Sequence, residues 1–252
     1  MGRRDCTPFV IMFTGRTGSS HLTRLLKSHP DVHASGEKLG KLRNQGADAR
    51  AQLEWVDETL SRRGQFRAVG FKVKLRQPLD LEGFTALLRQ HQPQIIRMER
   101  RNVVKHVISQ MNVSRVRSAT GKPNATGAQS RLPPIEIDPD DLINRIRLLE
   151  AYEAEVSDYV ASLGMPTELV AYEELLVGEE LVVNRVLDFL GVPRRTLTSP
   201  VRKSSPDDLR LAVKNFDEMA GALRGTPYET MLTEVQIPAD NLDESGAALR
   251  RA

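Results

Sequence analysis

The chain contains a single cysteine, Cys6, among its 252 residues, so no disulfide can form within it. A chain without disulfides suits a reducing compartment, and we expect a cytoplasmic protein. Long apolar runs are also missing. The N-terminal run Phe9–Phe13 is too short to cross a bilayer or to form the apolar part of a signal peptide. The sequence therefore predicts no membrane span.

An excess of charge of either sign is missing as well. The chain has 36 Lys and Arg residues against 33 Asp and Glu residues, a net charge of +3. The basic residues are spread along the chain, and no basic stretch alternates with aromatic residues. We therefore expect no nucleic-acid partner, whereas the small positive excess fits an anionic ligand.

Strand-like and helix-like patterns alternate along the chain, which predicts an α/β fold. Short strands are expected at Phe9–Thr14, Val32–Ser35, Arg67–Leu75, Gln94–Glu99 and Glu168–Ala171. Helices are expected at about 19–28, 47–62, 81–91, 102–117, 139–163 and 181–190, and a further one opens at 205–208. This order predicts three layers, with a central parallel sheet flanked by helices.

No internal repeat or interdomain linker interrupts the pattern, so a single domain over residues 1–252 is expected. Its core would cover about residues 8–235, followed by a weakly ordered tail at 238–252. Residues 118–139 contain four prolines and predict a long loop, which is either a binding lid or a mobile insertion.

A glycine-rich turn follows the first strand, and it is the most informative segment of the sequence. Gly15 and Gly18 allow a sharp turn, and hydroxyl residues open the next helix. Backbone N–H groups and a helix N-terminus then converge on one point that suits a phosphate, and Arg16 adds a positive charge. The alternative is a plain strand–turn–helix corner. The turn resembles a P-loop but lacks Gly-Lys-Ser/Thr, which disfavours an ordinary NTPase.

A second candidate anion site combines Arg101 with Ser109. An arginine at a strand-to-helix turn and a serine two turns into the helix can reach the same phosphate. Arginine and serine are common, so this pair gains meaning only together with the turn at 15–20.

Together the two elements resemble the PAPS-dependent sulfotransferases. In that family an N-terminal strand–loop–helix holds the 5′-phosphosulfate, and a later Arg-x7-Ser element holds the 3′-phosphate. The resemblance implies a P-loop-like core, with PAPS as co-substrate and PAP as product. It assigns donor binding to Gly15, Arg16, Thr17, Gly18, Ser19, Ser20, Arg101, Ser109, Arg202 and Lys203. The segment Tyr172–Leu176 also resembles one of the family and is expected to be structural.

The residues in which the chain differs from the family's cytosolic members indicate which branch of the family it resembles. The cytosolic phenol and steroid enzymes carry Lys-Thr-His on the third strand, with the histidine as base. Here that stretch is Lys72-Val73-Lys74, without a histidine, and Arg202-Lys203-Ser204 does not reproduce their Arg-Lys-Gly. The chain is therefore more similar to the bacterial and carbohydrate-type members.

Glu37 is the candidate general base, and Arg16 and Lys72 complete the candidate catalytic set. Glu37 follows the second strand, at the sheet edge that faces ligands in open α/β folds, and it matches the proposed base of bacterial and Golgi-type relatives. His33, Lys72 and, less so, His106 are alternative bases. Lys72 reaches the sulfonate or, alternatively, lies on a solvent-facing side near the sheet edge.

The sequence thus predicts an enzyme that moves a sulfonate from PAPS to a hydroxyl of a carbohydrate or other small-molecule acceptor, by in-line transfer. A P-loop-type nucleotide or sugar kinase and a non-catalytic nucleotide-binding protein are the alternatives. No metal site is expected, because Pro30 interrupts the only helix-like histidine pair, His29 and His33. The acceptor, and the choice between a monomer and a homodimer, stay open.

Overall fold

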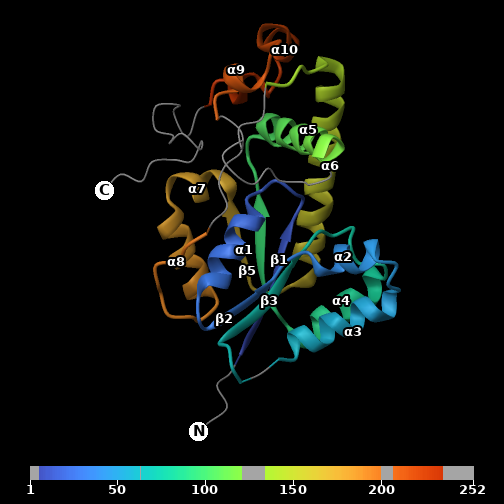
Figure 1. Ribbon diagram of the computed structural model, residues 1–252, viewed down its shortest axis with the longest axis vertical. Coiled ribbons are helices and arrows are strands. Elements are labelled where there is room, and N and C mark those ends of the chain that lie inside the picture. Colours follow the sequence, from blue (N-terminus) through green and yellow to red (C-terminus); the bar gives the residue numbers. More distant parts are fainter. Residues whose placement is uncertain (1–5, 63, 121–133, 200–206, 235–252) are drawn as a thin grey trace. The chain divides into compact units, whose positions relative to one another are not determined.

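The computed structural model describes residues 6–62, 64–120, 134–199 and 207–234. They fall into two compact units, which Figure 1 draws and which we describe separately. The sheet unit comprises Met1–Glu99 and Glu153–Val201, and the helical unit comprises Arg100–Tyr152 and Arg202–Ala252. The single domain expected from the sequence stays a prediction. The expected tail, residues 200–206 and most of the proline-rich loop lie outside the described residues.

The sheet unit is built on five parallel strands in the order β2-β3-β1-β4-β5 (Figure 1). The strands are β1 (Thr7–Phe13), β2 (Val32–Ser35), β3 (Ala68–Val73), β4 (Gln94–Glu99) and β5 (Thr167–Ala171). The prediction of a parallel α/β sheet is confirmed. The central strand β1 is the first in the chain, and its carboxyl end leads directly into the glycine-rich turn.

Helices cover both faces of this sheet, as the three-layer prediction requires. On one face, α1 (Ser19–Ser28), α7 (Tyr172–Val177) and α8 (Glu179–Phe189) share a buried core with Phe9, Ile11 and Phe13. On the other face, Phe71 packs edge-on against Trp55 of α3 (Ala49–Leu60) and Phe84 of α4 (Leu81–His91). The side chains alternate between the faces because successive residues of a strand point in opposite directions.

Helix ends follow the expected capping chemistry. The Asp48 and Asp80 side chains accept hydrogen bonds from Ala51 N and Gly83 N at the starts of α3 and α4. Three helices were not predicted: α7, α10 (Phe216–Leu223) and α2 (Lys38–Asn44), of which α2 follows Glu37 directly. A glycine at its third position, Gly40, obscures the helical pattern in the sequence.

The helical unit packs α5 (Val103–Thr120), the first part of α6 (Pro139–Leu163), α9 (Leu209–Ala212), α10 (Phe216–Leu223) and η1 (Glu229–Leu232) around an apolar core. Asn102 caps α5, as predicted, because its Oδ1 accepts from Lys105 N at 2.9 Å. Lys105 and Asp207 form a buried ion pair at 3.0 Å. Across the described residues, no helix is long and apolar enough to cross a membrane.

The alternative of a solvent-facing Lys72 is wrong. Strand β3 lies between β2 and β1 in the sheet, and Lys72 is only 6 % exposed. Its backbone pairs with Ile11, so it shares the sheet face that α1 covers.

Gly70 is a sensitive position for folding. A Cβ on Gly70 would lie 2.1 Å from the backbone oxygen of Phe9 on the neighbouring strand. Because a backbone atom of the central strand cannot move aside, we expect Gly70→Ala to lower the free energy of unfolding by about 2 kcal/mol or more. Urea unfolding measures this, with Gly36→Ala as the control, since nothing lies within 4 Å of a Cβ there. Equal stability of the two variants would contradict the packing described.

Candidate functional site

The turn after β1 has the backbone geometry of an anion cradle. We call residues 14–20 the first loop. Three of them have positive φ angles: Gly15 at 109°, Arg16 at 59° and Gly18 at 77°. Gly18 is the N-cap of α1 and offers no side-chain cap to the first turn of that helix. Such a loop presents backbone N–H groups and a helix N-terminus to a negatively charged ligand.

A neighbouring side chain also disfavours any residue but glycine at position 18. A Cβ on Gly18 would lie 2.9 Å from Cδ2 of Tyr172, at the start of α7. A Cβ on Gly15 would meet Lys74 only at ordinary contact distances of 3.4 and 3.6 Å, so the positive φ angle is what favours glycine there. The Tyr172 segment therefore packs against the first loop, which fits the structural role expected for it.

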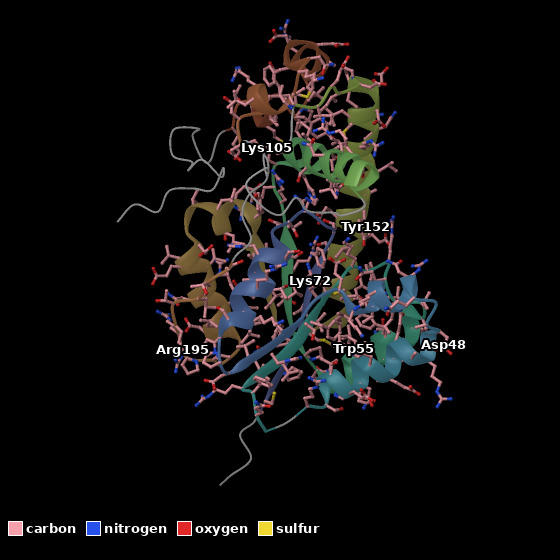
Figure 2. The ribbon with its side chains drawn as sticks, viewed as in Figure 1. Asp48, Trp55, Lys72, Lys105, Tyr152 and Arg195 are labelled. Atoms are coloured by element: carbon pink, nitrogen blue, oxygen red, sulfur yellow. The ribbon has the colours of Figure 1, made fainter. Side chains whose placement is uncertain are left out.

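Glu37, Lys72 and Ser20 meet at the carboxyl ends of the strands, where the sequence placed Glu37. Lys72 Nζ donates to Ser20 Oγ at 2.7 Å and lies 3.3 Å from Glu37 Oε1. Lys74 Nζ lies 3.3 Å from Glu37 Oε2. We call Ser20, Glu37, Lys72 and Lys74 the charged cluster; Figure 2 labels Lys72 within it.

The ammonium groups of both lysines lie over the aromatic ring of Phe13. Lys72 Nζ and Lys74 Nζ lie 5.0 and 5.5 Å from the centre of the Phe13 ring, within the range of a cation–π attraction. Phe13 is the last residue of β1, so the same strand carries both the first loop and the aromatic support. This placement allows two cations to stay close to each other with one carboxylate between them.

The charged cluster keeps Glu37 ionised. Burial raises the pKa of the Glu37 carboxyl, but Lys74, Lys72 and a hydrogen bond from Gln77 outweigh burial, and the pKa lies below its usual value. Burial lowers the pKa of Lys72, and the Glu37 carboxylate opposes only part of that effect. Glu37 is therefore a carboxylate that can accept a proton or pair with a cation.

Two partners of the site were missed by sequence reasoning. Gln77 donates to Glu37 Oε2 at 2.8 Å, and its only sequence signal is its place in the turn after β3. Glu153 of α6 accepts from Thr14 Oγ1 at 2.5 Å and from the buried Arg97 of β4. Glu153 thereby anchors the start of the first loop, and no pattern in the sequence links it to that loop.

The other candidate residues lie elsewhere or in the helical unit. His33 contacts Ser35 and Arg62, and burial together with Arg62 and Lys27 lowers its pKa. His106 is fully buried in α5. Arg101 is exposed directly before α5, and Ser109 is half-buried within it. Arg202 and Lys203 lie outside the described residues, so the second anion site stays a prediction.

The ion pairs of Glu37 predict a stability that depends on pH. A carboxyl whose pKa is lowered on folding stabilises the protein fully above its unfolded pKa, near 4.5, and loses that contribution as the pH falls through its folded pKa. We therefore expect wild type to exceed Glu37→Gln in stability at neutral pH and the difference to shrink on acidification. Urea unfolding across this range measures it, with Glu54→Gln as an exposed control. A difference that is constant with pH would contradict the ion pairs.

Comparison with known proteins bears on the fold and on the similarity of the whole chain. No family model matches the chain. It is 24% identical to nodulation protein H of Rhizobium tropici over 237 residues, which cover 88% of this chain and 91% of the relative. Nodulation protein H of Rhizobium meliloti is 26% identical over 239 residues, with 88% and 93% covered. The crystal structure of a sulfotransferase from Alicyclobacillus acidocaldarius matches with a TM-score of 0.52 at 20% identity and covers 90% of this chain and 95% of that one. The chain is therefore similar to nodulation protein H over most of both chains, and it has the fold of a bacterial sulfotransferase, as the sequence predicted.

Proposed function

We propose that the protein binds PAPS and transfers its sulfonate to a hydroxyl of a carbohydrate or another small molecule. One observation carries this proposal: an ionised carboxylate, Glu37, stands between Lys72 and Lys74, and Lys72 also contacts Ser20 of the first loop. A sulfonate transfer needs a base for the acceptor and cations for the leaving group within the same few ångströms, and the charged cluster combines them.

The first loop fits the phosphosulfate end of the donor. Its positive φ angles turn the backbone into a cradle, and α1 begins without a side-chain cap that would compete for its N–H groups. Arg16 and Lys72 would supply fixed positive charge beside those groups. For the 3′-phosphate we propose Arg101 and Ser109, with Arg202 and Lys203 as further cations, on the resemblance to the family.

When bound, PAPS supplies a sulfonate on a phosphate leaving group, so negative charge grows on the oxygen that joins them. Lys72 and the backbone N–H groups of residues 17–20 would stabilise that charge more strongly in the transition state than in the ground state. Because these donors are held by the sheet and by α1, they need little rearrangement during the reaction.

Glu37 would accept the proton of the acceptor hydroxyl. Its two lysine partners hold the carboxylate in place and in its ionised form. A lowered pKa makes Glu37 a weaker base, and the positive charge around it compensates by stabilising the developing alkoxide. We propose a carbohydrate acceptor because the chain resembles the carbohydrate-type members of the family. We propose a cytoplasmic location because Cys6 is the only cysteine and no disulfide can form within the chain.

We expect PAP to raise the melting temperature, because a ligand that binds only the native state adds RT ln(1 + [L]/Kd) to the free energy of unfolding. Differential scanning fluorimetry with PAP, ATP and GTP measures the shift.

Arg101→Ala should weaken PAP binding by roughly 1.5–3 kcal/mol, the scale of a charged hydrogen bond to phosphate. Arg50→Ala on the exposed side of α3 is the control. Stabilisation by ATP but not by PAP would favour the kinase alternative and reject our proposal.

Glu37→Gln should leave PAP affinity nearly unchanged and lower the single-turnover rate by about 10²-fold or more, the usual scale for a general base. An acceptor is first identified by screening hydroxyl compounds with labelled PAPS. Single-turnover measurement then excludes slow PAP release as the limiting step. Glu54→Gln, which changes an exposed carboxylate, is the control. A normal rate in Glu37→Gln would remove Glu37 as the base, and His33 and Lys72 would be tested next.

A further inference from the structure

The Gln77 amide bridges the Glu37 carboxylate and the backbone N–H of Lys74. We propose that Gln77 is a positioning residue that fixes the orientation of the Glu37 carboxylate, and that Gly40 is required to make room for its amide. The catalytic part of this proposal rests on the proposed function, because it gives Glu37 a role in the reaction. The geometric part stands on its own.

The orientation of the Gln77 amide follows from its partners. Its Oε1 accepts a hydrogen bond from the backbone N of Lys74 at 3.0 Å. A backbone N–H can only donate, so the atom facing it must be the amide oxygen, and the NH₂ group must face Glu37. Nε2 then donates to Glu37 Oε2 at 2.8 Å. The amide thus has one arrangement that satisfies both contacts.

The contact differs in kind from the lysine contacts of Glu37. Lys72 and Lys74 each approach the carboxylate at 3.3 Å with an ammonium group. Ammonium groups attract a carboxylate from many directions, whereas a planar amide offers its N–H groups in fixed directions. The hydrogen bond from Gln77 therefore determines how the carboxylate is turned, while the lysines make the larger contribution to its lowered pKa and Gln77 a smaller one.

The backbone that carries Gln77 is itself held in place. Gln52 of α3 is 2 % exposed, and its Nε2 donates to Leu39 O at 2.8 Å and to Gln77 O at 3.2 Å. Its Oε1 accepts from Leu79 N at 2.8 Å. Gln77 N also donates to Lys74 O at 2.9 Å within the turn. The buried Gln52 side chain therefore connects α2, which follows Glu37, to the turn after β3, which carries Gln77.

Gly40 lies inside α2, where glycine is the poorest helix former after proline. Its φ angle is not in the left-handed region, so the backbone does not require glycine there. A Cβ at this position would lie 2.6 Å from Gln77 Nε2 and 3.1 Å from its Cδ. The amide of Gln77 occupies the space that any other residue would fill, which accounts for the glycine.

The test is Gly40→Ala. Alanine favours the helix, and the atom it meets is the end of a side chain that can swing away, so the variant should fold, with the gain in helix propensity offsetting part of the lost hydrogen bonds. The displaced amide no longer donates to the ionised carboxylate, so the pKa of Glu37 should rise. Carbon-13 NMR titration of the side-chain carboxyl, assigned with Glu37→Gln, measures this in the protein without donor. Gly221→Ala in α10, where a Cβ meets open space, is the matched control and should leave Glu37 unchanged.

A double-mutant cycle separates an effect through Gln77 from an effect of α2 itself. Gln77→Met keeps the length of the side chain and removes both hydrogen bonds, so it should raise the pKa of Glu37 as Gly40→Ala does. If Gly40 acts through Gln77, the double variant should match Gln77→Met alone. An unchanged pKa in both single variants, or full additivity in the double variant, would overturn the proposal.

Kinetics adds the catalytic part. Gly40→Ala and Gln77→Met should each lower kcat by about tenfold or more and leave PAP affinity unchanged, because a carboxylate turned away from its productive direction transfers protons poorly. If Glu37→Gln shows a normal rate, the proposed base is wrong, but the titrations still decide whether Gln77 orients Glu37. If Glu37→Gln is slow and Gln77→Met has a normal kcat, Gln77 is not a positioning residue for the reaction.

Discussion

The burial of Lys72 beside Glu37 is the constraint on which the site depends. A lysine on a strand inside the sheet loses most of its water, and burial disfavours its charged form. The Glu37 carboxylate and the Ser20 hydroxyl replace part of that water, and the Phe13 ring lies beneath. These partners come from β1, α1 and the segment after β2. The buried lysine therefore brings three separate parts of the chain into contact.

This arrangement explains why cations are not enough for such a site. Lys72 lies in the last part of β3 and Lys74 directly after the strand, and the two would repel each other without a carboxylate between them. Glu37 neutralises part of their charge and is kept ionised by them. The cluster thus remains compact without a ligand, while its net charge stays positive toward an incoming anion.

The sequence predicted those parts of the structure whose residues follow one another along the chain. The strand, the first loop and the start of α1 follow one another in residues 7–20, and periodicity located all five strands, because local pattern and local structure coincide there. Glu37 and Lys72 were placed at strand ends of a parallel sheet, and the structure brings them within 3.3 Å of each other, while their roles in the reaction stay predictions. Gln77 and Glu153 were not found, because each reaches the site from a different segment through one side-chain contact. Helix α2 was missed because it contains Gly40, a poor helix former whose missing side chain leaves room for the Gln77 amide.

The strand order also bears on how the chain folds. β1 precedes both of its partners in the sheet, which begin only at Ala68 and Gln94. Pairings between such distant segments form slowly, since long loops must close before any contact rewards them. Until then, the apolar strand that will carry the first loop has two unpaired edges, which can pair with other chains. The centre of the sheet, which gives the site its rigidity, is therefore the part of the nascent chain most exposed to aggregation.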